Sequence, residues 1–220
     1  EAATNAVTAD FGTISGGHGN IANGESATVS GGYANYASGK SANVAGGTEN
    51  IASGENSSVS GGIFNSAAGF NATTSGGAGN VATGYSATVS GGEDNSATSN
   101  YATVSGGERN TAGGMHSAVT GGFLNIAGGD YSLASGRRAK IDAAHDGAFL
   151  FSDQNNFDFN SAAANEFAAR ATGGVRFVTA IDGSGTPTQT VSIDNTGKVT
   201  AAAFVGDGSG LTNVTPGNGW

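Results

Sequence analysis

A pattern of 15 residues, S-G-G-x-x-N-x-A-x-G-x-x-A-x-V, is written eight times without insertion or deletion between Ser15 and about Ser135. Each copy has a Gly-Gly pair, an Asn three positions after the pair and an Ala two positions after that Asn. A constant short period predicts a stack of equivalent units instead of one closed globule. The asparagines of the eight copies are Asn20, Asn35, Asn50, Asn65, Asn80, Asn95, Asn110 and Asn125.

Each copy contains two short runs in which small or apolar residues alternate with other residues, the first from Asn20 to Gly24 and the second from Ala27 to Gly31 in the opening copy. Alternation with a period of two indicates β-strands. The phase slips after each run, which predicts a turn where glycine supplies a positive φ. Each copy is therefore expected to form one flat coil with Ala and Val inside, stacked about 4.8 Å from the next coil in parallel ladders.

The asparagine column has two interpretations. In the first, the side-chain amides form a ladder in which each amide bonds to the turn of the next coil. In the second, each Asn simply adopts a turn conformation. The ladder is the favoured interpretation, and the turn conformation is the alternative.

A single thin coil buries little apolar surface, roughly one Val and two Ala side chains. Ordering its backbone costs more than such a small core returns, so further copies of the chain are the expected source of buried surface. One outward column is more apolar than the others and is assigned to a subunit interface, whereas the columns that contain Thr28 and Ser30 are assigned to solvent. The interface residues are Ile21, Tyr36, Ile51, Val81 and Ile126.

The repeat resembles the head domain of the YadA-type trimeric autotransporter adhesins (hep_Hag type) over about residues 12–140. Its Ser-Gly-Gly opening and 15-residue length make it slightly longer than the common adhesin repeat. The resemblance implies an all-β, left-handed parallel β-roll that assembles as a homotrimer. It also implies an extracellular place on the bacterial cell surface or outer membrane and a host protein or glycan receptor.

Three of the eight Lys and Arg residues, Arg137, Arg138 and Lys140, fall where the repeat stops. A related basic neck ties the three chains together in the adhesin family. We therefore expect ion pairs that cap the roll or join neighbouring chains, with acidic partners at Asp142, Asp146 and Asp153. The alternative is a solvated cationic cap over an open sheet edge.

The expected organisation has four parts: a lead-in at 1–14, the roll at 15–136, a basic neck or cap at 137–160, and a β-hairpin-rich segment at 161–220. In the last part, strands are predicted from Val175 to Ala180, from Thr188 to Ile193 and from Lys198 to Val205, with turns at 182–185 and 194–197. Residues 206–214 resemble a linker of trimeric phage-type tail fibres, in which a chaperone domain often follows. The chain is therefore expected to be truncated.

Composition excludes several classes of function. A net charge of −9 leaves no broad basic field for nucleic acid. No run of 18 apolar residues is present, so no membrane insertion by this segment is expected. Without cysteine there is no disulfide or thiolate zinc site. Phosphate loops, nucleophile elbows and calcium-roll repeats are also missing, so no cofactor and no metal is predicted.

The three histidines, His18, His116 and His145, are far apart in the sequence, and the first two occupy unrelated positions of the repeat. They are interpreted as surface or turn residues and not as metal ligands or general bases. The chain is thus expected not to be an enzyme, with no catalytic residue assigned.

Three hypotheses about function follow. The leading one is a structural and adhesive module of a trimeric bacterial surface adhesin. The alternative is a shaft or receptor-binding segment of a phage-type tail fibre, located on a virion. A polysaccharide-degrading fibre enzyme is less favoured, because its carboxylate pair would have to come from Asp153, Asp158 and Glu166 in a loop-rich stretch.

Overall fold

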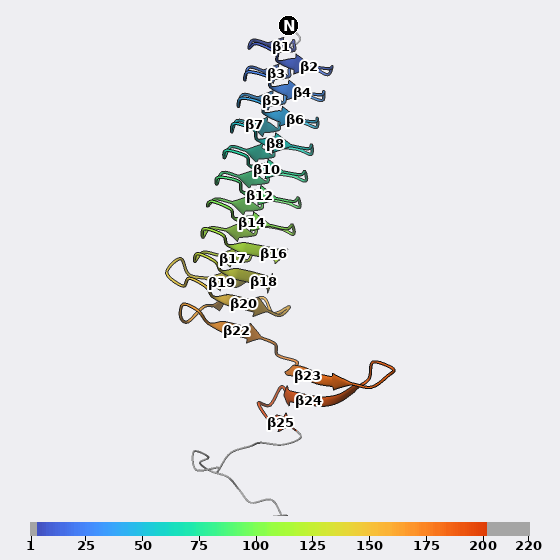
Figure 1. Cartoon of the computed structure of the whole chain (residues 1–220), viewed down its shortest axis with the longest axis vertical. Helices are drawn as coiled ribbons and strands as arrows, with labels where there is room; N and C mark the ends of the chain where they lie inside the picture. The colour runs from blue at the N-terminus through green and yellow to red at the C-terminus, as the bar shows by residue number, and fades with distance from the viewer. Residues whose placement is uncertain (1–3, 202–220) are drawn as a thin grey trace, which may run out of the picture. The chain divides into compact units, whose positions relative to one another are not determined.

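The structure is a computed structural model that describes residues 4–201. These residues divide into two compact units, the first ending at Arg170 and the second beginning at Ala171. All regular elements of the described part are β-strands. Within the first unit the coils stack one on another along the long direction of Figure 1.

Two parallel sheets of 11 strands each run along the first unit. The first sheet contains β1 (Ala6–Val7), β3 (Ile21–Ala22), β5 (Tyr36–Ala37), β7 (Ile51–Ala52), β9 (Ser66–Ala67), β11 (Val81–Ala82), β13 (Ser96–Ala97), β15 (Thr111–Ala112), β17 (Ile126–Ala127), β19 (Ala139–Ile141) and β21 (Phe159–Asn160). The second contains β2 (Thr13–Ile14), β4 (Thr28–Val29), β6 (Asn43–Val44), β8 (Ser58–Val59), β10 (Thr73–Thr74), β12 (Thr88–Val89), β14 (Thr103–Val104), β16 (Ala118–Phe123), β18 (Leu133–Arg137), β20 (Phe149–Ser152) and β22 (Phe167–Arg170).

The core is a column of small side chains from both sheets and from the turn between them. Ala22, Ala27 and Val29 of one coil are completely buried, and the same positions repeat along the stack. Within the repeat these side chains stay small, because sheets joined by such short turns lie close together. Larger buried side chains, Ile141 and Leu150, join the core only after the repeat ends. The predicted all-β parallel solenoid of 15-residue coils is confirmed, as is the small β-rich C-terminal segment. Left-handed coiling and the homotrimer stay predictions.

A third ladder, which the sequence did not predict, follows each Gly-Gly pair. It consists of single-residue parallel bridges that link His18 to Tyr33 and continue coil by coil to Phe123. Each coil therefore contacts the next along three lines and not two. This extra line explains why the segment between the two sheets stays in register although it is too short to form a strand.

Glycine was expected to supply the positive φ in both turns of each coil, but it does so in only one of them. In the turn from Gly24 to Ala27, the left-handed residue is Ser26, with a φ of 58°. Gly24 is instead needed for space, because a Cβ there would lie 2.1 Å from the carbonyl oxygen of Gly39 in the next coil. In the Gly-Gly turns the expectation holds, and Gly32 has a φ of 90°.

The coils begin earlier and end later than the repeat does. β1 and β2 already pair with β3 and β4, so residues within the expected lead-in form the first coil. At the other end, parallel pairing continues through β20 and β22, and the roll ends at Arg170 and not at residue 136. The expected neck at 137–160 is thus part of the coils. The spacing between pairing partners now varies, although the ladders are not broken. Ile126 pairs with Lys140, 14 residues later, whereas inserted loops put Phe159 20 residues after its partner Ala139.

The second unit is an antiparallel sheet of three strands in the order β23 (Val175–Ile181), β24 (Pro187–Ile193) and β25 (Val199–Ala201). Its two turns lie where the sequence predicted them, at 182–185 and 194–197. In each turn the carboxylate of the leading residue, Asp182 or Asp194, accepts three hydrogen bonds from residues two and four positions later. The predicted tail-fibre-type linker at 206–214 lies outside the described residues.

Candidate functional site

The asparagine column is buried and hydrogen-bonded along the whole repeat. In a central coil, the Nδ2 atom of Asn50 donates to the carbonyl oxygens of Gly46 in its own turn, at 2.9 Å, and of Gly62 in the next coil, at 2.8 Å. Its Oδ1 atom accepts a hydrogen bond from the backbone N–H of Asn65 at 2.9 Å. Each amide thus holds together the Gly-Gly turns of successive coils.

The column is longer than the repeat. Asn5 was missed by sequence reasoning, although it lies 15 residues before Asn20. Its Oδ1 atom accepts from the backbone N–H of Asn20 at 2.9 Å. At the other end, the Oδ1 atom of Asn125 accepts a hydrogen bond from the backbone N–H of Ala139. Ala139 occupies the asparagine position of the next coil, which is one residue shorter. None of the eight repeat asparagines has a positive φ; the left-handed residue is the one before, such as Ala34.

The column assigned to a subunit interface lies on the outer face of the first sheet. Ile21, Ile51 and Ile126 expose 37%, 41% and 37% of their surface, while Tyr36 and Val81 are half-buried. A shallow hollow of about 440 Å³ opens among Ile21, Tyr36, Ile51 and nearby residues. The corresponding outer column of the second sheet is polar over most of the repeat, from Thr28 to Thr103.

The basic cluster joins one coil to the loop after β20. The Nε atom of Arg138 lies 2.8 Å from Oδ1 of Asp158 in an ion pair. Arg137 donates to Oδ1 of Asn156 at 2.9 Å and to the carbonyl oxygen of Gln154 at 3.3 Å. These contacts lie within one chain, so the expected clamp between chains stays a prediction.

Lys140 donates to the carbonyl oxygen of Leu124 in the coil above. Partial burial lowers the pKa of Lys140, and the positive charge of Arg138 lowers it further, whereas Asp158 opposes the shift. The acids expected as partners bond elsewhere: Asp142 and Asp146 accept from backbone N–H groups. Asp153 pairs with Arg170, at 3.0 Å.

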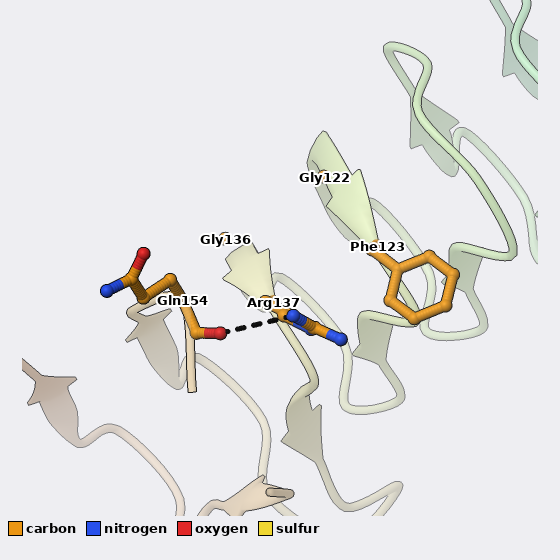
Figure 2. Close-up of a pocket in the computed structure, with 5 residues that line it drawn as sticks. All are labelled: Gly122, Phe123, Gly136, Arg137 and Gln154. Atoms are coloured by element: carbon orange, nitrogen blue, oxygen red, sulfur yellow. Dashed lines mark hydrogen bonds between the residues drawn. The ribbon is translucent and has the colours of Figure 1, made fainter. Parts of the chain in front are cut away.

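A cavity of about 480 Å³ lies beside this cluster. The residues that line it, which Figure 2 shows as sticks, are Gly122, Phe123, Gly136, Arg137 and Gln154. The guanidinium of Arg137 lies 5.5 Å from the centre of the Phe123 ring, and its Nε atom is buried without a hydrogen-bond partner. The two terminal nitrogens already bond to the 154–156 loop. The cavity therefore presents apolar surface and little free polar chemistry.

The acids weighed as a glycosidase pair are held in structural contacts. Asp153 and Asp158 pair with Arg170 and Arg138, respectively. Glu166 accepts a hydrogen bond from the backbone N–H of Ala162 at 2.7 Å. The arginine at the end of the roll, Arg170, was missed by sequence reasoning because its partners lie at least 13 residues away. This arrangement braces the last coils and engages both aspartates in ion pairs with arginines.

The histidines lie in three different settings. His18 stacks on Tyr33 with ring centres 5.5 Å apart. His145 bonds through Nδ1 to the hydroxyl of Ser161 at 2.6 Å. His116 lies between Tyr101 and Tyr131, with ring centres 4.7 and 5.3 Å apart.

His116 belongs to an aromatic ladder on the edge of the roll that the sequence analysis missed. Neighbouring rings lie 4.7–5.5 Å apart, and all pairs are nearly parallel except Tyr85 and Tyr101, which meet edge to face. The available signal was an aromatic residue every 15 or 16 positions near the Gly24-type turn. The aromatic ladder comprises Phe70, Tyr85, Tyr101, His116 and Tyr131.

No protein-family model matches the chain, and no curated protein matches it significantly. Over residues 4–201 the structure has no helix long and apolar enough to cross a membrane.

Proposed function

We propose that this chain is a structural and adhesive segment of a homotrimeric fibre on a bacterial cell surface, which attaches the cell to host matrix or to other cells. The observation that carries the proposal is the apolar outer column of the first sheet. Exposed Ile21, Ile51 and Ile126 recur along one side of a roll whose opposite column is mainly Thr and Ser.

Three copies arranged around an axis parallel to the stack would bury this column along its whole length. The hollow beside Tyr36 can receive a side chain from a neighbouring copy. Such an assembly adds buried apolar surface where each coil has only Ala and Val inside. The result is a stiff rod whose polar outer faces remain available to a receptor.

Sedimentation equilibrium of the chain tests the assembly. The expected mass is three times the 21.2 kDa of one chain. Ile51→Glu, in β7, should shift the equilibrium toward the monomer, because it places a charge in the buried column. Ser58→Glu, in β8 on the other sheet, is the matched control and should leave the trimer intact. A monomer at micromolar concentration for the unaltered chain would contradict the proposal.

Attachment is tested separately with beads that carry the chain. Beads with the unaltered chain should bind immobilised host matrix or host cells more strongly than beads with Ile51→Glu, since three linked copies gain avidity. Equal binding by bare beads would remove the adhesive part of the proposal and leave only a structural rod.

A shaft or receptor-binding segment of a phage-type tail fibre is the second candidate. It is favoured by the antiparallel unit of β23, β24 and β25 that follows the parallel roll. Recovery of the native protein with purified virions instead of outer-membrane fractions would favour this candidate. A polysaccharide-degrading enzyme ranks third, because Asp153 and Asp158 are engaged by arginines; release of reducing ends from capsular polysaccharide would raise it.

A further inference from the structure

The antiparallel sheet of the second unit has one face made entirely of apolar side chains. Residues directly opposite one another in an antiparallel sheet point to the same face. Phe177 of β23 lies opposite Val191 of β24, and Val191 also lies opposite Ala201 of β25. The apolar face that this register defines comprises Val175, Phe177, Val191, Ile193, Val199 and Ala201.

This apolar face is uncovered in the described part of the chain. Between residues 171 and 201 no residue is buried, and none belongs to the hydrophobic core of the roll. Phe177, Ile193 and Val199 expose 52%, 39% and 48% of their surface. A small sheet becomes stable by covering its hydrophobic face. The second unit therefore obtains a core only from whatever packs on this face.

The charges of the second unit favour association between identical copies. The whole chain has a net charge of −9, but residues 171–201 contain two basic and two acidic residues, Arg176, Lys198, Asp182 and Asp194. Arg176 points to the opposite face of the sheet, and the other three lie at the two turns. Because this unit is neutral and no charge lies on the apolar face, the faces of two copies can meet without repulsion.

The size of the apolar face indicates that its partner is already held nearby. Strands of seven, seven and three residues, about 4.8 Å apart with about 3.4 Å per residue, give roughly 300 Å². A standard interface buries about 800 Å² on each partner, so this face is too small to capture a separate protein from dilute solution. Copies joined along the roll meet at a far higher effective concentration, which makes a small face sufficient.

We infer that the apolar face is a second interface of the fibre, where the same face of three copies packs around one axis and completes a core that a single copy lacks. Each copy contributes the ring of Phe177 and the side chain of Val191 to this shared core. The interface is separate from the outer column of the first sheet that contains Ile51, and the number of copies rests on the proposed trimer.

Hydrogen exchange of the full chain tests this interface. Val191 lies on the central strand, so Val191→Asp puts a charge in the middle of the apolar face. Amides of residues 175–193 should then exchange at least about tenfold faster, whereas those of residues 30–100 should not change. Thr190→Asp is the matched control, because it adds the same charge one residue away on the opposite face. Equal exchange in the two variants would overturn the interface.

Two further variants identify what covers the apolar face. Ile51→Glu, which should separate the copies, should also speed the exchange of residues 175–193. A chain that ends at Ala201 should keep the protection of the unaltered chain. If the shortened chain loses this protection while monomeric Ile51→Glu keeps it, residues 202–220 of the same chain cover the face and the interface between copies is overturned.

Sedimentation equilibrium of the same samples separates this interface from the proposed one. A trimer in which Val191→Asp and Thr190→Asp exchange alike would overturn the second interface and leave the proposed trimer standing. A monomeric Val191→Asp beside a trimeric Ile51→Glu would do the reverse, since the second unit and not the roll would then hold the chains together. Circular dichroism of each variant shows whether the roll is folded.

Discussion

The Oδ1 atom of Asn65 accepts hydrogen bonds from both the backbone N–H and the side-chain Nδ2 of Asn80, at 3.0 and 3.1 Å. The bond from the backbone N–H repeats at every step from Asn20 to Asn125, and the bond from the side chain at most of them. Each amide oxygen therefore accepts from the coil after it. The Nδ2 atom of Asn65 also donates to the carbonyl oxygens of Gly61 and Gly77, in two successive Gly-Gly turns. The asparagine column therefore links every coil to its neighbours through buried amide groups.

Replacing Asn65 by Ala should therefore destabilise the roll. The backbone N–H of Asn80 would lose its acceptor inside the protein, at a cost of about 1–3 kcal/mol. Ser60→Ala, at the exposed residue that follows β8, should change the free energy of unfolding far less. Urea unfolding followed by circular dichroism measures both variants, and equal midpoints would show that the amide column adds no stability.

Substitution by alanine should destabilise the roll to different extents at the two glycines of one pair, Gly76 and Gly77. A Cβ on Gly77 would lie 2.1 Å from the carbonyl oxygen of Gly92, whereas a Cβ on Gly76 would meet nothing closer than 4.0 Å. Both have a positive φ, so both substitutions strain the backbone by about 1–3 kcal/mol. Only Gly77→Ala also forces two coils apart.

Thermal melting distinguishes the pair. Gly77→Ala should lower the melting temperature clearly more than Gly76→Ala. A similar loss for both would mean that backbone strain alone decides their effect and that the coils can separate at little cost.

The regular part of the fold could be predicted because its period is constant. A strict 15-residue spacing fixes the register of every ladder, and the alternation of Ala22 and Val29 with polar neighbours fixes which face is inside. The same spacing did not reveal the left-handed Ser26, because a serine in that conformation has no sequence signature. The end of the roll was missed since inserted loops hide the period while the ladders continue to Arg170.

The candidate site was less predictable than the fold. The asparagine column could be named because identical residues recur at identical positions. The aromatic ladder changes from one turn position to the next between Tyr85 and Tyr101, so it does not appear as a single column. The apolar face of the second unit was also missed, because it follows from the register between its strands and not from a repeat.

In the second unit, the turn at Asp182 should resist acid. A hydrogen bond from the Ser184 hydroxyl, together with backbone bonds from Thr186 and Ser184, lowers the pKa of Asp182 below its usual value. Since the folded-state pKa is lowered, the turn's stabilisation is present above about pH 3.9, the ordinary Asp pKa, and is lost as pH falls through the lowered value.

NMR titration of the Asp182 carboxyl carbon measures this shift. Ser184→Ala removes the largest cause and should raise the midpoint toward the ordinary value. Asp194, which accepts equivalent bonds from Thr196 and Lys198 in the other turn, is the internal control and should not move. An unaltered Asp182 midpoint in the variant would show that the hydroxyl does not stabilise the carboxylate.

The basic cluster should hold the lower coils together. Arg137, at the end of β18, and Arg138, just after it, bond to the loop at 153–158, and Lys140 reaches back to the coil above. Exposed ion pairs are individually weak, but here the cations also bond to backbone carbonyls and side-chain amides. Replacing all three residues by Gln leaves a polar, unbranched but shorter side chain and removes the charge.

Hydrogen exchange followed by mass spectrometry measures the effect. Protection should fall at residues 135–160 and persist at 30–100, because the upper coils keep their own asparagine column and glycine turns. Arg109→Gln is a matched control, since its contacts are exposed and reach only Asp94 in the previous coil and the adjacent Glu108. If the triple variant loses protection only as a trimer, the cluster also joins chains. Unchanged protection throughout would reduce it to a solvated cap.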